Sequence, residues 1–145
     1  MSPEERVLVM DTSGWLSYYG LGSPVKVRVV RGVVDLFRAL GFVLGYTSPT
    51  LYEIRKSPRP EIRGRRADIL GFVRSRGVLV GPSYDRLIDL VSFVPEAYRH
   101  DAAIALAAGP HVLLTLDAWQ AMFRLAAGGK TIYLDARIFQ KGDRQ

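Results

Sequence analysis

The sequence predicts an α/β protein in which a mostly parallel central sheet is flanked by helices in a three-layer sandwich. Short apolar segments alternate along the chain with longer segments of helical periodicity, the pattern of parallel sheets with helices on both faces. The chain has 145 residues, of which 48% are hydrophobic and 23% charged, as is typical of one globular domain. We therefore expect a single domain over residues 1–138, followed by a polar tail over 139–145.

The first third of the chain contains one expected strand and two expected helices. Val7–Met10 is short and apolar, as in a buried strand. The residues Asp11-Thr-Ser-Gly that follow are good helix caps, so we expect a helix that continues to Tyr19. Apolar residues then recur at helical spacing over Val25–Leu40, and Gly41 provides a C-cap.

The rest of the chain continues this alternation. Phe42–Tyr46 predicts a strand, and Ser48 with Pro49 predicts the N-cap and first residue of a helix that ends at the Ser-Pro pair 57–58. One further helix is expected from about Glu61 to Ser75. The remaining strands are expected at Val78–Val80, Val112–Leu116 and Thr131–Leu134, and the remaining helices at Ser83–Val94, Asp101–Ala108 and Ala118–Ala126.

The composition excludes several classes of site. The chain has no cysteine, so disulfides, thiolate zinc sites, iron–sulfur clusters and cysteine nucleophiles are excluded. No apolar segment approaches the roughly 18 residues that a membrane-spanning helix requires, and the acidic start of the chain differs from a secretory signal. We therefore expect a cytoplasmic protein that does not associate with membranes.

The charge of the chain indicates an anionic partner. It carries 20 basic and 14 acidic side chains, a net charge of +6. Sixteen of the basic residues are arginine, whose guanidinium binds phosphate in a forked geometry. A basic surplus on a small domain is typical of proteins that bind nucleic acid.

Four acidic residues stand where the carboxyl ends of parallel strands would meet. Asp11 directly follows the first strand, and Asp117 ends the strand that begins at Val112. Glu53 lies in the first turns of the helix after the second strand, and Asp101 opens the helix that precedes the Asp117 strand. Parallel α/β sheets bind ligands at this edge, so we expect the four carboxylates to lie together there.

Such a cluster of carboxylates has a specific chemistry. Unpaired carboxylates raise each other's pKa, and they stay ionised together when a cation lies among them. Mg²⁺ takes such oxygen ligands, and one or two such ions activate water for hydrolysis of phosphodiester bonds. Taken singly, Asp11, Asp101 and Asp117 are more simply explained as helix caps. The hypothesis of a metal site therefore depends on the convergence of all three with Glu53.

The four acids lie in short motifs that resemble a known family. The motifs are Val-Leu-Val-Met-Asp11-Thr-Ser, Thr-Ser-Pro-Thr-Leu-Tyr-Glu53-Ile, His-Asp101-Ala-Ala-Ile-Ala and Leu-Leu-Thr-Leu-Asp117. In this order, over about residues 7–135, the chain resembles a PIN domain, the small nuclease fold of VapC-type toxins and of RNA-processing nucleases. The resemblance implies a PIN-like sandwich and an Mg²⁺- or Mn²⁺-dependent endoribonuclease. Asp11, Glu53, Asp101 and Asp117 would be its catalytic, metal-binding acids.

The resemblance also implies supporting residues and partners. Thr12, Ser13 and Thr115 would hydrogen-bond the carboxylates or a water, although capping and strand-end hydrogen bonds explain them as well. We expect His100, next to Asp101, to be a capping or surface histidine. The absence of a cysteine-rich module favours a stand-alone member, such as the toxin of a toxin–antitoxin pair. RNA would be its substrate and an antitoxin protein a partner; an RNA-processing nuclease outside such a pair is the alternative.

Six basic residues lie within twelve positions just after the second acid. They would bind the RNA backbone beside the site or an acidic segment of a partner protein, while a solvated helix–loop face is the structural explanation. The six are Arg55, Lys56, Arg59, Arg63, Arg65 and Arg66.

Several alternatives stay open at this stage. The apolar stripe of Val25–Leu40 exceeds what one core face requires, so this helix either helps to form a homodimer, as the family often does, or is deeply buried. Trp15 is expected in the core rather than stacked on bases. The chain could instead be a non-catalytic RNA- or protein-binding module on the same fold. A phosphatase-type domain using Asp11 fits less well, because Ser13 stands where its second aspartate would be.

Overall fold

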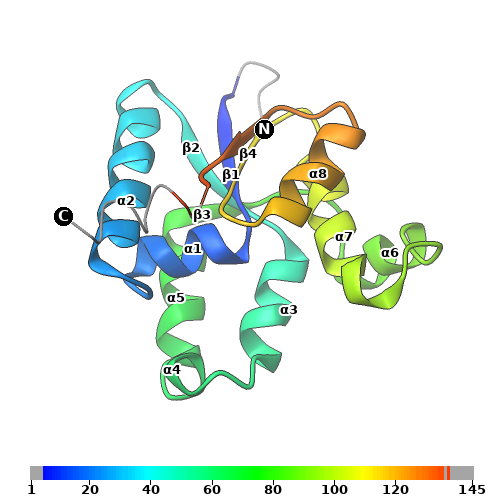
Figure 1. The fold of residues 1–145 in the computed structure, drawn as a ribbon, viewed down its shortest axis with the longest axis horizontal. Coiled ribbons are helices and arrows are strands. Elements are labelled where there is room, and N and C mark those ends of the chain that lie inside the picture. The colour runs from blue at the N-terminus through cyan, green and yellow to red at the C-terminus, as the bar shows by residue number, and fades with distance from the viewer. Residues whose placement is uncertain (1–4, 136, 138–145) are drawn as a thin grey trace.

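A five-stranded sheet forms the centre of the computed structural model, which describes residues 5–135 and 137 (Figure 1). The strand order is β3-β2-β1-β4-β5, and every neighbouring pair is parallel. The strands are β1 (Val7–Met10), β2 (Val43–Tyr46), β3 (Gly77–Leu79), β4 (Val112–Thr115) and β5 (Thr131–Tyr133). The predicted α/β class, with a parallel sheet between layers of helices, is therefore confirmed.

Strand β1 lies at the centre of the sheet and is buried on both faces. Leu8 and Met10 enter the hydrophobic core on one face, whereas Val7 and Val9 enter the core on the other, because successive strand residues point in opposite directions. All four side chains are at most 1% exposed. Burial on both faces explains why this strand is a continuous apolar run in the sequence.

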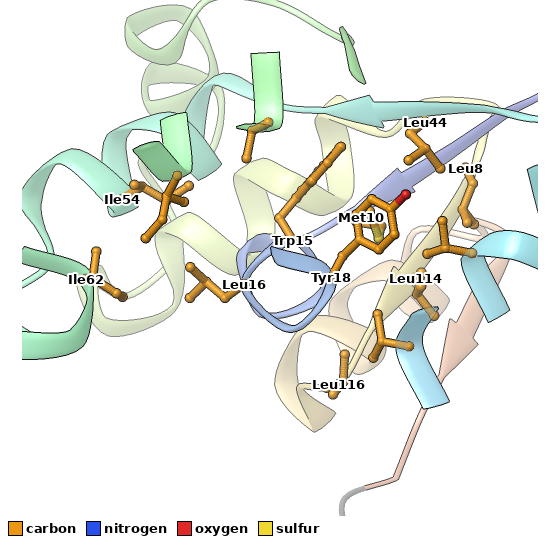
Figure 2. Close-up of a cluster of buried hydrophobic side chains, with 14 residues drawn as sticks. Leu8, Met10, Trp15, Leu16, Tyr18, Leu44, Ile54, Ile62, Leu114 and Leu116 are labelled. Carbon is orange, nitrogen blue, oxygen red and sulfur yellow. The ribbon is translucent and has the colours of Figure 1, made fainter. Parts of the chain in front are cut away.

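The helices α1 to α5 contribute to the core that contains Leu8 and Met10. Figure 2 shows this core, in which the indole of Trp15 is fully buried and its Nε1 donates a hydrogen bond to the carbonyl of Gly45 at 3.1 Å. Trp15 is therefore a core residue, as predicted. The helices are α1 (Thr12–Tyr19), α2 (Pro24–Ala39), α3 (Ser48–Lys56), α4 (Pro60–Arg63) and α5 (Arg66–Arg76).

Most of the apolar side chains of α2 pack against the core of the same domain. Val30 and Val34 are fully buried, and Val29, Val33 and Phe37 pack against the same core. Packing against the sheet thus accounts for most of the stripe without a second copy of the chain.

The opposite face of the sheet carries α7 (Arg99–Ala107) and α8 (Ala118–Ala126), with α6 (Tyr84–Leu90) packed against α7 (Figure 1). A short 3₁₀ turn, Glu96–Tyr98, precedes α7. The small alanine side chains of α7 allow close packing on both sides of the helix. Its Ile104 contacts the sheet core, while its Ala103 packs under Leu87 of α6.

One buried cation ties α8 to the end of α7. Arg124 is 3% exposed and donates hydrogen bonds to the carbonyls of Ala105 at 2.8 Å, Gly109 at 2.6 Å and His111 at 2.5 Å. The last carbonyls of a helix lack intrahelical partners and carry partial negative charge. The guanidinium therefore both satisfies these groups and fixes α8 against the C-terminus of α7.

Three expected helices differ from the structure. The segment Glu61–Ser75 forms two helices that are separated at Gly64 and Arg65, because Arg65 has φ −133°, outside the helical range. The helix expected to reach Val94 ends at Leu90, since the following turns bury Val91 and Val94 beside α7.

The third difference is the N-cap of α3. Thr47 holds that position rather than Ser48, whose hydroxyl donates instead to the carbonyl of Pro82 at 3.1 Å. The polar tail expected over 139–145 lies outside the described residues.

Candidate active site

The structure brings the four predicted acids to one edge of the sheet. Asp11 follows β1 as the N-cap of α1, and Asp117 follows β4 as the N-cap of α8. Glu53 lies in α3, which follows β2, and Asp101 lies in the first turn of α7. Because β2, β1 and β4 are parallel neighbours, their carboxyl ends share this edge. Asp11 and Asp117 also cap helices, as the simpler explanation of the sequence states. Each of them is therefore both an N-cap and a member of the acidic group.

Asp11 is held in a fixed orientation. Its Oδ1 accepts hydrogen bonds from the Ser13 hydroxyl at 2.8 Å and the Gly14 amide at 2.9 Å, and its Oδ2 accepts one from the Thr115 hydroxyl at 2.5 Å. Burial raises the pKa of Asp11 to about 6, against the effect of these three hydrogen bonds and together with the negative charge of Glu53. Ser13 and Thr115 thus both hydrogen-bond a carboxylate of the predicted group.

Asp101 is the carboxylate most affected by its neighbours. Burial chiefly, and then the negative charges of Asp117, Glu53 and Asp11, in that order, raise its pKa to about 7, while His100 acts in the opposite direction. A carboxylate senses like charges in this way when they lie within a few ångströms. The carboxylates of Asp117, Glu53 and Asp11 are thus near enough to Asp101 to affect its pKa.

Glu53 connects the acids to a group of aromatic residues. Its Oε1 accepts a hydrogen bond from the Thr12 hydroxyl at 2.6 Å, and its Oε2 lies 3.8 Å from Nδ1 of His100. Nε2 of His100 is in turn 2.8 Å from the hydroxyl of Tyr84. Burial chiefly, and then Tyr52, raises the pKa of Tyr84 to about 12, so its hydroxyl stays protonated at neutral pH and can donate to the ring.

Gln120 links the remaining two acids. Its backbone amide donates to Asp117 Oδ1 at 3.1 Å, and its side-chain Nε2 donates to the backbone carbonyl of Asp101 at 2.6 Å. The side chain is 1% exposed. A single buried residue of α8 therefore holds the first turn of α7 beside the carboxylate of Asp117.

The charges at this edge fit a divalent cation. Within residues 5–135 and 137, the only basic nitrogen within 4 Å of any of the four carboxylates is Nδ1 of His100. In that part of the chain, no three His, Asp or Glu side chains lie close enough together to hold a metal ion between them. Mg²⁺ does not require such a cage, since it keeps several waters and is commonly held by one or two carboxylates. The oxygen donors at this edge thus suit a hydrated cation that one or two of the carboxylates hold, with waters as its other ligands.

Two grooves meet beside Glu53 and His100. One, of about 340 Å³, extends toward Lys56 and Arg59. The other, of about 510 Å³, extends over Tyr84 toward Glu96 and Arg99. Tyr52, Glu53 and His100 line both grooves, so the two adjoin at Glu53, and Asp101 lines the larger one.

The six basic residues that were predicted to bind RNA or a partner differ in their exposure and in their contacts. Arg55, Lys56, Arg63 and Arg65 are exposed, as a contact surface for a polyanion requires. Arg59 is exposed but pairs with Glu61 at 2.6 Å. Arg66 is partly buried and donates from its guanidinium to the carbonyl of Ser57 at 2.5 Å, so it holds the loop between α3 and α4 in place.

Sequence reasoning missed the aromatic part of the site. His100 was expected to be a capping or hydrogen-bonded surface histidine; it is partly exposed, and its ring nitrogens face Glu53 and Tyr84. Tyr52, Tyr84 and Gln120 carried no sequence signal, because their roles depend on contacts between distant helices. The position of Tyr52 directly before Glu53 could have indicated that its side chain lies at the same edge.

Comparisons with known proteins do not identify a family. No family model matches the chain, and no curated protein is similar to it. Across the described residues, every helix is too short or too polar to cross a lipid bilayer.

Proposed function

We propose that the protein is a metal-dependent endoribonuclease that hydrolyses phosphodiester bonds in RNA. The observation that supports this most is the convergence of Asp11, Glu53, Asp101 and Asp117 from four separate segments, with no arginine or lysine of the described chain within 4 Å. Burial and the negative charges of the other three acids raise the pKa of Asp101 to about 7. A bound cation would offset the repulsion between the carboxylates that contributes to this shift.

The chain's own residues have distinct roles in this proposal. Asp11, Glu53, Asp101 and Asp117 would hold Mg²⁺ or Mn²⁺. Ser13 and Thr115 orient the carboxylate of Asp11, and Thr12 orients that of Glu53, through the hydrogen bonds described above. Bound there, the ion supplies positive charge that lowers the pKa of a water and stabilises the negative charge that develops on the phosphate.

The exposed basic residues are proposed to bind the RNA backbone. Arg55, Lys56, Arg63 and Arg65 lie on α3 and on the α4–α5 corner that follows it, on the side of Glu53 toward which the smaller groove extends. This arrangement places positive charge around an acidic site. RNA phosphates would be attracted by the surface and held beside the acids.

The biological setting is part of the same proposal. The resemblance of the motifs to VapC-type toxins favours the toxin of a toxin–antitoxin pair in the cytoplasm, with an antitoxin protein as partner. For a homodimer, the exposed side chains of Trp119, Met122 and Leu125 on α8 offer a more accessible apolar surface than α2. Sedimentation of the purified protein would measure the number of copies.

The decisive experiment is cleavage of a pool of structured and single-stranded RNAs with Mn²⁺ or Mg²⁺. We expect cleavage by the wild-type protein, its loss in EDTA, and a loss of about 100-fold or more in Asp101→Asn. Asp89→Asn, which changes an exposed aspartate of α6, should cleave like the wild type. Equal cleavage by Asp101→Asn and wild type would refute the assignment.

A folded protein that cleaves no RNA requires a second measurement. Titration with Mn²⁺ by calorimetry would then show whether the acids bind metal. If they bind none, the four carboxylates are structural and the protein is a non-catalytic RNA- or protein-binding module.

A further inference from the structure

Three aromatic rings form a compact group at the larger groove. The rings of Tyr52 and Tyr84 are stacked, with centroids 4.2 Å apart and planes 10° from parallel. The ring of His100 stands nearly perpendicular to both, at 5.3 Å and 5.5 Å, and is fixed by the hydroxyl of Tyr84. A stacked pair of tyrosines that is braced in this way is a rigid platform for a further planar group.

The charge around this platform suits a neutral ring rather than a phosphate. The groove is lined by three carboxylates, those of Glu53, Glu96 and Asp101. Arg99, which also lines it, already donates from Nε to the carbonyl of Val94 at 2.8 Å and from a terminal nitrogen to the carbonyl of Ser92 at 3.1 Å. The smaller groove beside Lys56 is therefore better suited to the phosphates of an RNA, and the larger groove is better suited to a nucleobase.

Glu96 adds a means of recognising the base. Its exposed carboxylate, at the start of the 3₁₀ turn, lines the groove that contains Tyr84. A carboxylate presents two acceptor oxygens side by side. Guanine alone among the four RNA bases presents two adjacent donors, N1–H and N2–H, on its Watson–Crick edge, the edge by which proteins commonly read unpaired bases.

We infer that the groove formed by Tyr52, Tyr84, His100 and Glu96 is a subsite for an unpaired guanine next to the phosphodiester bond that is cut. The inference rests on the proposed ribonuclease function. The guanine ring would stack on the tyrosine platform, and Glu96 would accept hydrogen bonds from its N1 and N2. The backbone would then continue past Glu53 toward Lys56.

The test is an NMR titration of the isotope-labelled protein with each of the four ribonucleoside 5′-monophosphates in EDTA. The phosphate is common to all four ligands, so any difference in affinity reports on the base. We expect guanosine monophosphate to shift resonances of Tyr84, Glu96 and His100 and to bind at least about tenfold more tightly than the other three, as is usual for a paired hydrogen-bond contact.

Two substitutions separate the parts of the subsite. Glu96→Gln changes an exposed residue and should abolish the preference for guanine while leaving the weaker binding of the other nucleotides unchanged. Tyr84→Leu should weaken all four, because stacking does not depend on the identity of the base. Asp89→Asn, an exposed acid outside the groove, serves as the matched control and should keep the preference.

The outcomes distinguish this inference from the proposed function. Equal affinity for all four nucleotides, or shifts confined to other surfaces, would overturn the guanine subsite whether or not the protein cleaves RNA. A preference for guanine that persists in Glu96→Gln would equally overturn it. A guanine preference that Glu96→Gln removes, in a protein that cleaves no RNA with any metal, would support the subsite and refute the nuclease.

Discussion

At the scale of single residues, the hydroxyl of Thr115 has an unusual position. It donates to Asp11 Oδ2 at 2.5 Å and accepts a hydrogen bond from the backbone amide of Asp117 at 2.9 Å. One side chain thus orients two acids that lie on different helices. The donated hydrogen bond also lowers the pKa of Asp11 against the effect of burial, which favours the ionised form that a cation needs.

Thr115→Val should therefore weaken metal binding without unfolding the protein. The substitution keeps the branched shape and removes the hydroxyl, and loss of such a supporting hydrogen bond typically costs 10- to 100-fold in metal affinity or activity. Calorimetric titration with Mn²⁺ would measure the affinity, with Thr131→Val on β5 as the control. Wild-type affinity in Thr115→Val would show that the hydroxyl does not orient the site.

The raised pKa values of Asp11 and Asp101 predict how stability depends on pH. Both carboxyls bind protons more tightly in the folded protein than in the unfolded chain, so the free energy of unfolding of the metal-free protein falls as the pH rises from about 4 to 7. The groups that face Asp101 are Asp117, Glu53, Asp11 and His100. In EDTA, the melting temperature should be higher at pH 5 than at pH 8.

The Asp101→Asn variant tests the cause of this dependence. It removes one of the repelling charges, so it should melt at a higher temperature than the wild type at pH 8 and show a smaller change between pH 8 and pH 5. An unaltered pH dependence in Asp101→Asn, relative to both the wild type and Asp89→Asn, would place the responsible groups elsewhere.

At the scale of secondary-structure elements, α7 and α8 act as a clamped pair. Gln120 of α8 donates to the carbonyl of Asp101 near the start of α7, and Arg124 donates to the carbonyl of Ala105 near its end. The two contacts fix the helices along their length. Asp101 and Asp117 are thereby held in one rigid unit.

Arg124→Met should destabilise this unit. The variant keeps much of the side-chain volume but leaves the carbonyls of Ala105, Gly109 and His111 without their donor. The carbonyl of Ala105 is buried, and an unpaired buried carbonyl costs roughly 1–3 kcal/mol. Water can reach the carbonyls of Gly109 and His111, so we expect a loss of about 1–3 kcal/mol in the free energy of unfolding. Urea denaturation would measure this loss.

Arg86→Met, at an exposed position on α6, is the matched control and should change stability by less than about 0.5 kcal/mol. A similar stability for both variants would mean that waters replace the guanidinium at the end of α7.

The elements show which features the sequence predicts and which it does not. Strand β1 and helix α8 were predicted with their observed bounds, because burial on both faces and the Asp117 cap leave clear local signals. The break at Arg65 was missed, since no proline or strong turn motif marks it. Asp11 and Asp117 could be predicted because they directly follow strands, and Glu53 and Asp101 because their helices flank those strands in the chain. The places of His100 and Tyr84 depend instead on how α6 packs against α7.

At the scale of the whole molecule, the corner between α4 and α5 presents exposed basic residues near the acids. Arg63 and Arg65 are exposed at the corner between α4 and α5, while Arg66 is engaged with the carbonyl of Ser57. The double variant Arg63→Gln/Arg65→Gln should therefore reduce the affinity for RNA and lower the dependence of log affinity on log salt by about 1 for each phosphate contact that is lost.

Fluorescence anisotropy of a labelled RNA at several salt concentrations measures this slope. Arg28→Gln/Arg38→Gln removes the same charge from α2 and should leave the slope near that of the wild type. If the two double variants have equal slopes, only net charge matters, and the corner between α4 and α5 has no specific contact with RNA.

The strand order has a consequence for how the protein is made. The strand translated first, β1, lies in the middle of the sheet, and its neighbour β4 is translated about a hundred residues later, as the 104 positions between Asp11 and Thr115 illustrate. On the ribosome, one edge of β1 therefore remains without its partner until most of the chain has emerged, and such long-range pairing forms late in folding. Asp11 and Asp117 come together only at that stage, so a nascent chain lacks the assembled acids while it is still beside the RNA of the ribosome that makes it.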